Sequence, residues 1–132
     1  MIFVDTSFWV ALRNRRDGHH DAARRLLRLK AATPLVCTNH VRGETWTFLR
    51  RRAGHASATN FLDFIEESER LYVEHIDAAT EGEAMGWLRR HDEREYSFVD
   101  ATSFALMRRL GISEAFAFDG DFAAAGFVEL RP

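Results

Sequence analysis

Two carboxylates each close an apolar run of the sequence. Asp5 follows residues 2–4 and Asp119 follows residues 115–118, and both runs are expected strands. The carboxyl ends of parallel strands meet at one edge of a sheet, where open α/β folds gather their functional groups. Taken singly, Asp5 would serve as well as a helix N-cap, and Asp119 as part of a type I turn over residues 119–121. Taken together, the two acids are expected to converge.

Two further carboxylates lie on expected helices. Glu44 belongs to a helix that we expect to be capped by Asn39 and to run to about Ala53. At about 100° per residue, Glu44 lies on the margin of the apolar stripe of this helix. Asp100 falls in the first turn of an apolar helix over residues 97–110, where free amides favour an anion. A solvated Glu44 and a structural Asp100 are the alternatives, but a half-buried carboxylate is costly unless it is paired or bound to a metal.

Carboxylates forced together raise one another's pKa, and a hard divalent cation relieves the repulsion. Oxygen ligands without a constellation of Cys or His indicate Mg²⁺ or Mn²⁺ rather than Zn²⁺. Such an ion lowers the pKa of a bound water and screens phosphate charge, which is the chemistry of phosphodiester hydrolysis. The four acids therefore predict a metal-dependent phosphodiesterase.

The expected elements alternate along the chain. Strands over residues 2–4, 35–37, 71–76, 115–118 and 127–130 are interspersed with helices over about 8–12, 22–29, 39–53, 57–68, 78–90 and 97–110. This order is typical of a mostly parallel sheet of about five strands with helices on both faces. With 132 residues, 46% of them hydrophobic, the chain is expected to form one α/β domain over residues 1–132 and not to be disordered.

Location and redox chemistry are also constrained. No apolar run approaches the roughly 20 residues that cross a bilayer, and Asp5 comes too early for a signal peptide. We therefore expect a cytoplasmic protein without membrane contact. The single cysteine, Cys37, lies in an apolar run and is expected to be a buried small hydrophobe rather than a nucleophile.

The charges are divided unevenly. Residues 1–60 carry eleven basic and four acidic side chains, a net charge of +7, while residues 61–132 carry seven and sixteen, a net charge of −9. All basic residues except Lys30 are Arg, the side chain that grips phosphate bidentately. Candidate RNA contacts are Arg13, Arg15, Arg16, Arg50, Arg51 and Arg52. Ordinary solvated helix faces are the alternative interpretation of these arginines.

Four sequence segments, taken together, resemble a known family. A strand ending in Asp5-Thr6-Ser7, Glu44 in the third helix, Ser97-Phe98-Val99-Asp100-Ala101 and Phe118-Asp119-Gly120-Asp121-Phe122 resemble the PIN-domain ribonucleases. The length and order are similar to those of the VapC toxins of type II toxin–antitoxin pairs. The resemblance covers essentially the whole chain.

The resemblance implies roles for individual residues. Asp5, Glu44, Asp100 and Asp119 would form the catalytic acidic quartet, with Asp5, Asp100 and Asp119 as ligands of Mg²⁺, and Mn²⁺ would also support activity. Thr6 would orient a carboxylate or a metal-bound water, and Ser97 would cap the helix that presents Asp100. Asp121 matches a position that varies in the family.

The resemblance also implies a function and partners. The chain would be a Mg²⁺-dependent endoribonuclease whose metal-activated water attacks an RNA phosphodiester. As a toxin it would form a homodimer and be inhibited by a cognate VapB antitoxin lying across the active-site groove. A housekeeping PIN nuclease that matures RNA shares every one of these residues, and a PIN-like module that binds RNA or protein without cutting it is the alternative from another class.

Other activities that use acids or metals fit the sequence poorly. Haloacid-dehalogenase-like phosphatases need a second Asp where this chain has Ser7, and both they and response-regulator receivers use a late Lys, whereas the only lysine is Lys30. His40 and Glu44 have zinc-ligand spacing but no third ligand. Glycine-rich nucleotide loops are absent from the sequence.

Overall fold

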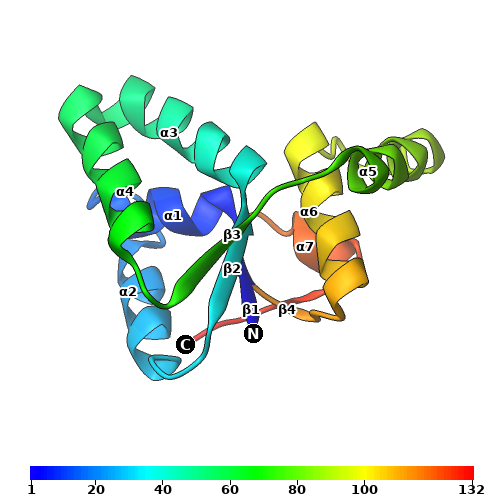
Figure 1. Ribbon diagram of the computed structural model, residues 1–132. Helices are drawn as coiled ribbons and strands as arrows, with labels where there is room; N and C mark the ends of the chain where they lie inside the picture. The colour runs from blue at the N-terminus through cyan, green and yellow to red at the C-terminus, as the bar shows by residue number, and fades with distance from the viewer.

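The sheet of the protein consists of five parallel strands. The computed structural model describes residues 1–132. The strand order is β3-β2-β1-β4-β5, and every neighbouring pair is parallel (Figure 1). The bounds are β1 Ile2–Val4, β2 Leu35–Thr38, β3 Leu71–Glu74, β4 Glu114–Phe116 and β5 Val128–Glu129. Because all strands run the same way, their carboxyl ends form one edge, which lies at the top of the sheet in Figure 1.

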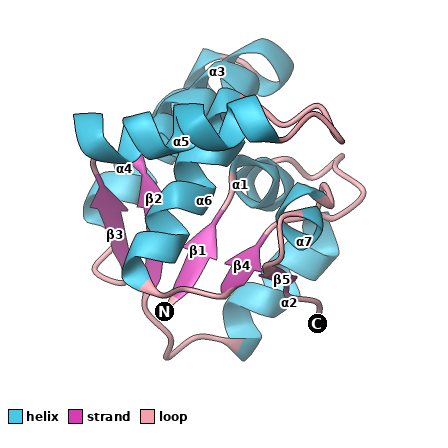
Figure 2. Cartoon of the chain, turned by 90° about the vertical axis from the view of Figure 1, so that its right-hand side faces the viewer, coloured by secondary structure: helices cyan, strands magenta, loops and turns pink.

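Seven helices cover the sheet from both sides. They are α1 Thr6–Arg13, α2 His20–Leu29, α3 Asn39–Ala53, α4 His55–Glu67, α5 Ala78–Arg90, α6 Phe98–Leu110 and α7 Asp121–Ala124. Helices α1 to α4 lie to the left of the sheet in Figure 1 and α5 to α7 to its right, and Figure 2 shows the sheet from the right-hand side. The α/β class, the parallel sheet of five strands and the two helical layers predicted from the sequence are confirmed.

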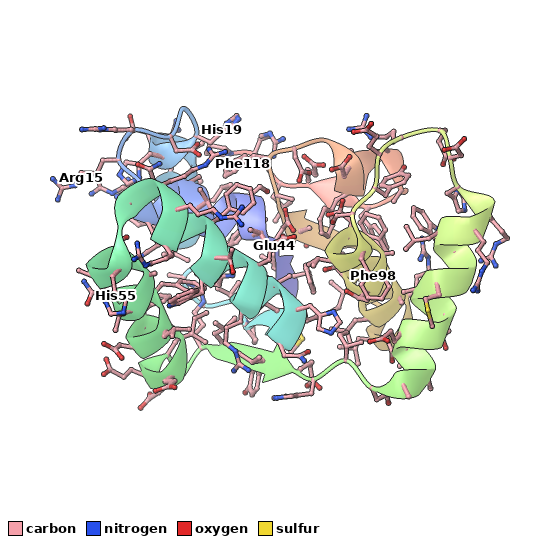
Figure 3. The ribbon with its side chains drawn as sticks, turned by 90° about the horizontal axis from the view of Figure 1, so that it is seen from above. Arg15, His19, Glu44, His55, Phe98 and Phe118 are labelled. Atoms are coloured by element: carbon pink, nitrogen blue, oxygen red, sulfur yellow. The ribbon has the colours of Figure 1, made fainter.

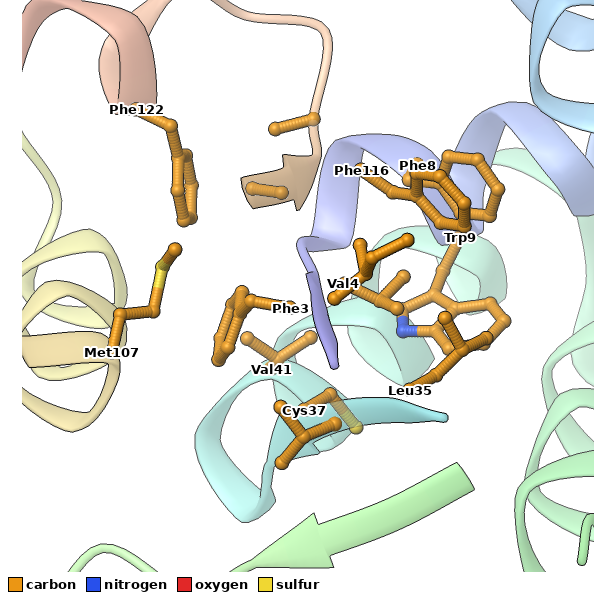
Figure 4. Packing of buried hydrophobic residues seen from close by; sticks show 14 of the residues in the cluster. Phe3, Val4, Phe8, Trp9, Leu35, Cys37, Val41, Met107, Phe116 and Phe122 are labelled. Atoms are coloured by element: carbon orange, nitrogen blue, oxygen red, sulfur yellow. The ribbon is translucent and has the colours of Figure 1, made fainter. Parts of the chain in front are cut away.

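The buried core lies on both faces of the central strand. Parallel strands that are covered on both faces are apolar along their whole length. In β1, accordingly, Ile2, Phe3 and Val4 are all buried. Successive side chains of β1 point to opposite faces. Phe3 meets Phe122 at 5.8 Å between ring centroids, and on the other face Phe116 stacks on Phe8 at 4.5 Å (Figure 4). This packing fixes Asp5, the residue after β1, at the carboxyl edge.

Three boundaries differ from the sequence expectation because side chains compete for the backbone. The strand expected over residues 115–118 pairs only to Phe116, since the amide of Phe118 donates to Ser7 Oγ. Thr38 rather than Asn39 caps α3, because Thr38 Oγ1 accepts from the amide of Val41. Asn39 Oδ1 instead accepts a hydrogen bond from the amide of Ile76, which lies two residues after the end of β3. The expected strand over residues 71–76 accordingly ends at Glu74.

The backbone after Asp119 differs from the turn that was the alternative interpretation of this acid. The type I turn considered over residues 119–121 does not form, because Gly120 has φ +84° and α7 follows it directly. An L side chain is strained in this left-handed region, so the conformation observed at residue 120 requires glycine. Cys37 is buried, as expected. None of the helices combines the length and apolarity needed to cross a bilayer.

Candidate metal-dependent active site

All four carboxylates singled out from the sequence line one cavity. Its volume is about 370 Å³, and it opens at the carboxyl edge of the sheet. Asp5 enters it from the end of β1, Glu44 from α3, Asp100 from α6 and Asp119 from the turn after β4. In the view from above in Figure 3, Glu44 points from α3 into the space between the two halves of the molecule. Residues remote along the chain are thus brought together as the sequence predicted.

Asp5 is held rigidly at the floor of the cavity. Its side chain is 2% exposed, and its Oδ2 atom accepts hydrogen bonds from the Ser7 amide at 3.1 Å and the Ser7 hydroxyl at 2.7 Å. Asp5 is therefore also the N-cap of α1, so the cap interpretation and the site interpretation both hold. Burial, together with the charge of Asp119, raises the pKa of Asp5 well above its usual value. The negative charges of Asp5 and Asp119 therefore repel each other, and a bound cation would reduce this repulsion.

Asp100 is fixed by a reciprocal cap. Ser97 Oγ accepts from the Asp100 amide at 2.9 Å, and Asp100 Oδ2 accepts from the Ser97 amide at 3.0 Å. The two bonds form a capping box at the start of α6, as expected of Ser97. Burial raises the pKa of Asp100 to about 6, even though the amide of Ser97 favours the charged form. In both buried acids Oδ2 is thus held by a serine, and both side chains line the cavity.

Asp119 and Asp121 face each other across the tight turn at Gly120. The amide of Asp121 donates to Asp119 Oδ1 at 3.1 Å. Asp119 is exposed as a residue. Partial desolvation of its carboxylate and the charge of Asp121 nevertheless raise its pKa. Asp121 has a cation of its own, because Arg94 Nε donates to its Oδ1 at 2.9 Å.

The donor set fits a hard divalent cation. Asp100, Asp119 and Asp121 offer carboxylate oxygens that all lie within 4.8 Å of one another. The hydroxyl of Thr6, which also lines the cavity, is buried and has no hydrogen-bond partner in the protein. Carboxylate and hydroxyl oxygens are ligands typical of Mg²⁺ and Mn²⁺. Asp121 joins the tightest group of acids. Asp5 lies outside this group, but the charge of Asp119 contributes to the raised pKa of Asp5.

Glu44 differs from the other acids in having no partner. It is half-buried, and none of the ion pairs in the protein includes it. Its carboxylate is therefore free to face whatever occupies the cavity.

The structure assigns a different hydroxyl to Asp5 from the one expected. Thr6 was expected to orient a carboxylate, but the hydroxyl that binds Asp5 belongs to Ser7, which also accepts the amide of Phe118 at 3.0 Å. The hydroxyl of Thr6 lines the cavity without a partner in the protein, and its expected role in orienting a metal-bound water stays a prediction.

Several residues of the cavity were not found from the sequence. Asp17, His19 and Glu95 line it, which brings the number of lining carboxylates to seven, and Phe48 adds an aromatic wall. Asp17 and His19 lie in the loop between α1 and α2, where no periodic pattern marks a functional residue. Ser7 is the one missed residue with a local signal in the sequence. A hydroxyl two residues after an Asp N-cap is a common hydrogen-bond donor to that Asp side chain.

The arginines predicted to contact RNA divide into two groups. Arg13 and Arg15 line a separate, larger cavity of about 910 Å³ between α1, α2 and α4, which holds none of the four acids. Arg16 and the run Arg50, Arg51 and Arg52 are exposed, the run at the end of α3. The guanidinium of Arg52 lies 4.9 Å from the ring of Phe48, so this arginine borders the acidic cavity. Their contacts with RNA remain a prediction.

Comparison with known proteins identifies relatives of the whole chain. The family model described as PIN domain matches residues 2–128. Proteins of two strains of Mycobacterium tuberculosis, both named 23S rRNA-specific endonuclease VapC20, are 60% identical over 133 aligned positions. That alignment spans 100% of this chain and 99% of each relative.

Solved structures agree with this relationship. The crystal structure of Mycobacterium tuberculosis VapC20, described as a sarcin–ricin loop cleaving toxin, superposes with a TM-score of 0.94 at 57% identity over 100% of both chains. FitAcB from Neisseria gonorrhoeae superposes with a TM-score of 0.64 at 16% identity, covering 98% of this chain and 96% of that one. The second similarity concerns the fold alone.

Proposed function

Because the chain belongs to the PIN domain family, we propose that it is an endoribonuclease toxin that hydrolyses a phosphodiester of 23S rRNA in the sarcin–ricin loop. The observation that carries the proposal is the convergence of Asp5, Glu44, Asp100 and Asp119 on one cavity. The substrate follows from the 60% identity to VapC20 over the whole chain. The RNA binds with the scissile phosphate over the acids.

Residues of this cavity are suited to hold a divalent metal, and we assign Mg²⁺, with Mn²⁺ able to replace it. Asp100 and Asp119, together with Asp5, are the ligands, and Thr6 faces the same space. A bound ion supplies a water of lowered pKa and neutralises charge on the phosphate. The oxygen-only donor set supports this assignment.

The protein itself positions the reacting groups. Ser7 and Ser97 hold the carboxylates of Asp5 and Asp100 in one orientation, so neither acid has to reorganise when RNA arrives. Glu44, which has no cation of its own, accepts the proton that the attacking water loses. Arg94 neutralises Asp121 and thereby limits the negative charge that an approaching phosphate meets.

We assign three further properties to the same function. The toxin is restrained by a VapB-type antitoxin whose chain covers the acidic cavity, and the active species is a homodimer. Its substrate is ribosomal, so it acts in the cytoplasm. The similarity to VapC20, whose crystal structure is described as that of a sarcin–ricin loop cleaving toxin and which is 57% identical over the whole chain, supports the toxin role over a housekeeping one.

The test uses purified full-length protein and an RNA hairpin that carries the sarcin–ricin loop. We expect cleavage with Mg²⁺ or Mn²⁺, none after EDTA, and none with Asp100→Asn. Asp63→Asn is the matched control, because Asp63 is an exposed acid on α4 outside the cavity. Binding without cleavage under all metal conditions would make the chain a binding module instead.

Growth experiments separate the toxin from a housekeeping nuclease. Induced expression is expected to arrest growth and to leave ends within 23S rRNA when total RNA is sequenced. We also expect a small reading frame upstream of the gene whose co-expression relieves the arrest. Harmless expression with ends elsewhere would contradict the toxin role.

A further inference from the structure

A column of stacked rings runs from the core to the rim of the acidic cavity. Phe116 stacks on Phe8 with centroids 4.5 Å apart and planes inclined by 16°. Phe8 in turn stacks on Phe118 at 5.9 Å and 18°. The last ring is that of His19, 4.5 Å from Phe118 and inclined by only 3°. Four rings thus lie nearly parallel.

The outer end of this column faces the cavity and the solvent. Phe8 and Phe116 are fully buried, Phe118 is half-buried, and His19 is exposed. His19 and Phe118 both line the cavity that holds the four acids. Figure 3 shows the two labelled side chains next to each other at the edge of the upper surface, with Glu44 nearer the centre.

The ring of His19 stacks on a well-anchored ring, and its backbone is also held. Its own backbone amide donates to Asp17 Oδ1 at 2.8 Å, which fixes the loop before α2. Beneath it, Phe118 is secured by its amide bond to Ser7 Oγ, and the guanidinium of Arg131 lies 5.1 Å from its ring. Arg131 is itself anchored to the carbonyl of Ala117 at 2.8 Å. A preordered, flat and solvent-facing ring beside a metal site is suited to bind another flat ring.

We propose that His19 is a stacking platform for one unpaired base next to the scissile phosphate. Bases that are splayed out of single-stranded loops are recognised by stacking on aromatic side chains and His. Such a base would extend the column by a fifth ring. A base within a continuous duplex cannot do so, because both its faces are covered by its neighbours. The platform selects RNA in which a nucleotide beside the cut is extruded.

This inference rests on the proposed ribonuclease function, since it assumes that RNA lies over the acids. It concerns the recognition of the substrate and not the chemical step. His19 is therefore a specificity-determining residue, and flatness of its ring, rather than proton transfer, is what matters. His19→Phe preserves the flat ring and removes the proton, which makes the two roles separable.

The first experiment compares cleavage kinetics of the sarcin–ricin loop hairpin. His19→Ala should raise KM about tenfold while kcat falls much less, because stacking on one base is worth roughly that factor. His19→Phe should recover most of the loss. His55→Ala is the matched control, since His55 is an exposed histidine on α4 that lies outside the cavity (Figure 3). Wild-type KM in His19→Ala, or a His19→Phe variant as impaired as His19→Ala, would overturn the proposal.

The second experiment detects stacking directly. The base 2-aminopurine, whose fluorescence is quenched by stacking, is placed at one loop position at a time, and the hairpin is bound to Asp100→Asn so that it stays intact. We expect one position to be quenched more strongly, and the additional His19→Ala change to remove that quenching. Equal quenching with and without His19 would refute the platform. Failure of the wild type to cleave would refute the proposed function, while the quenching measurement would still decide on His19.

Discussion

The hydroxyl of Ser7 donates to Asp5 Oδ2 at 2.7 Å and accepts the amide of Phe118 at 3.0 Å. One small side chain therefore connects the acid at the end of β1 to the backbone that leads from β4 to Asp119. The two strands are neighbours in the sheet, and the bond continues their pairing into the site. The side chain of Ser7 thus links Asp5 to the segment that carries Asp119.

Replacement of Ser7 by Ala should impair catalysis more than stability. The amide of Phe118 loses its partner, and Asp5 Oδ2 keeps only the backbone amide of Ser7, so the free energy of unfolding should fall by about 1 to 3 kcal/mol. Because Asp5 is then held by one hydrogen bond instead of two, kcat should fall by at least about tenfold. Ser103→Ala is the control: its hydroxyl is also buried and binds a backbone carbonyl, at 2.8 Å, but it lies outside the cavity. Equal kcat in the two variants would contradict a positioning role for Ser7.

Asp100→Asn should abolish activity and stabilise the metal-free fold. The amide oxygen of Asn can still accept from the Ser97 amide, so the cap of α6 survives. The buried negative charge, however, is removed. With a pKa of about 6 for Asp100 against an ordinary 3.8, ionisation of the wild type costs roughly 3 kcal/mol near neutral pH. Urea unfolding in EDTA measures the gain in the free energy of unfolding. A variant less stable than the wild type would show that the charge of Asp100 does not destabilise the metal-free fold.

The pH dependence of the metal-free protein should have the opposite sign from ordinary acid denaturation. Burial raises the pKa of Asp100 to about 6, so between its usual value and 6 the folded state binds more protons than the unfolded state. Stability is therefore highest where Asp100 is protonated, and it is lost as the pH rises through about 6. From about pH 5 to about pH 7.5 we expect a loss of about 1 to 2 kcal/mol from this group. Asp100→Asn should make the profile shallower by that amount, and the part that remains comes from Asp5 and Asp119, whose pKa values are also raised.

Metal addition should reverse this loss. The ligands must be deprotonated to bind a cation, so Mg²⁺ should raise Tm more at about pH 7.5 than at about pH 5. Thermal unfolding with and without EDTA at both pH values measures the difference. An equal shift at both values would place the cation away from the buried acids.

The fold and the four acids were predictable because their signals are local. Asp5 directly follows β1, Asp119 ends an apolar run that contains β4, and Asp100 lies three residues after the Ser97 cap. Such signals need only a few consecutive residues and the rule that parallel strands share a carboxyl edge. The same rule accounts for the correct class and sheet.

The parts that could not be predicted depend on contacts between distant segments. Ser7 owes its role to the amide of Phe118, 111 residues later, and Asn39 to the amide of Ile76, 37 residues later. His19 faces the cavity because Phe118 holds its ring, and nothing in the surrounding loop sequence encodes that contact. Side-chain bonds of this kind also shifted the ends of β4 and the cap of α3.

The arginines of the loop after α1 provide a test of how RNA is attracted to an acidic site. Arg15 and Arg16 are both exposed, and the loop that carries them also presents Asp17 and His19 to the cavity. Basic side chains there would offset the repulsion between the phosphate backbone and the acids.

Arg15→Glu combined with Arg16→Glu should weaken RNA affinity by at least about tenfold and make the dependence of log affinity on log salt shallower by about two units, one for each lost phosphate contact. Arg89→Glu with Arg90→Glu is the matched control, because this pair on α5 is exposed and lies outside the acidic cavity. Both double variants change the net charge equally, so a general electrostatic effect would lower their affinities alike. A selective loss with Arg15 and Arg16 would place the RNA backbone across the loop between α1 and α2, and identical salt slopes for both would exclude these arginines from the interface.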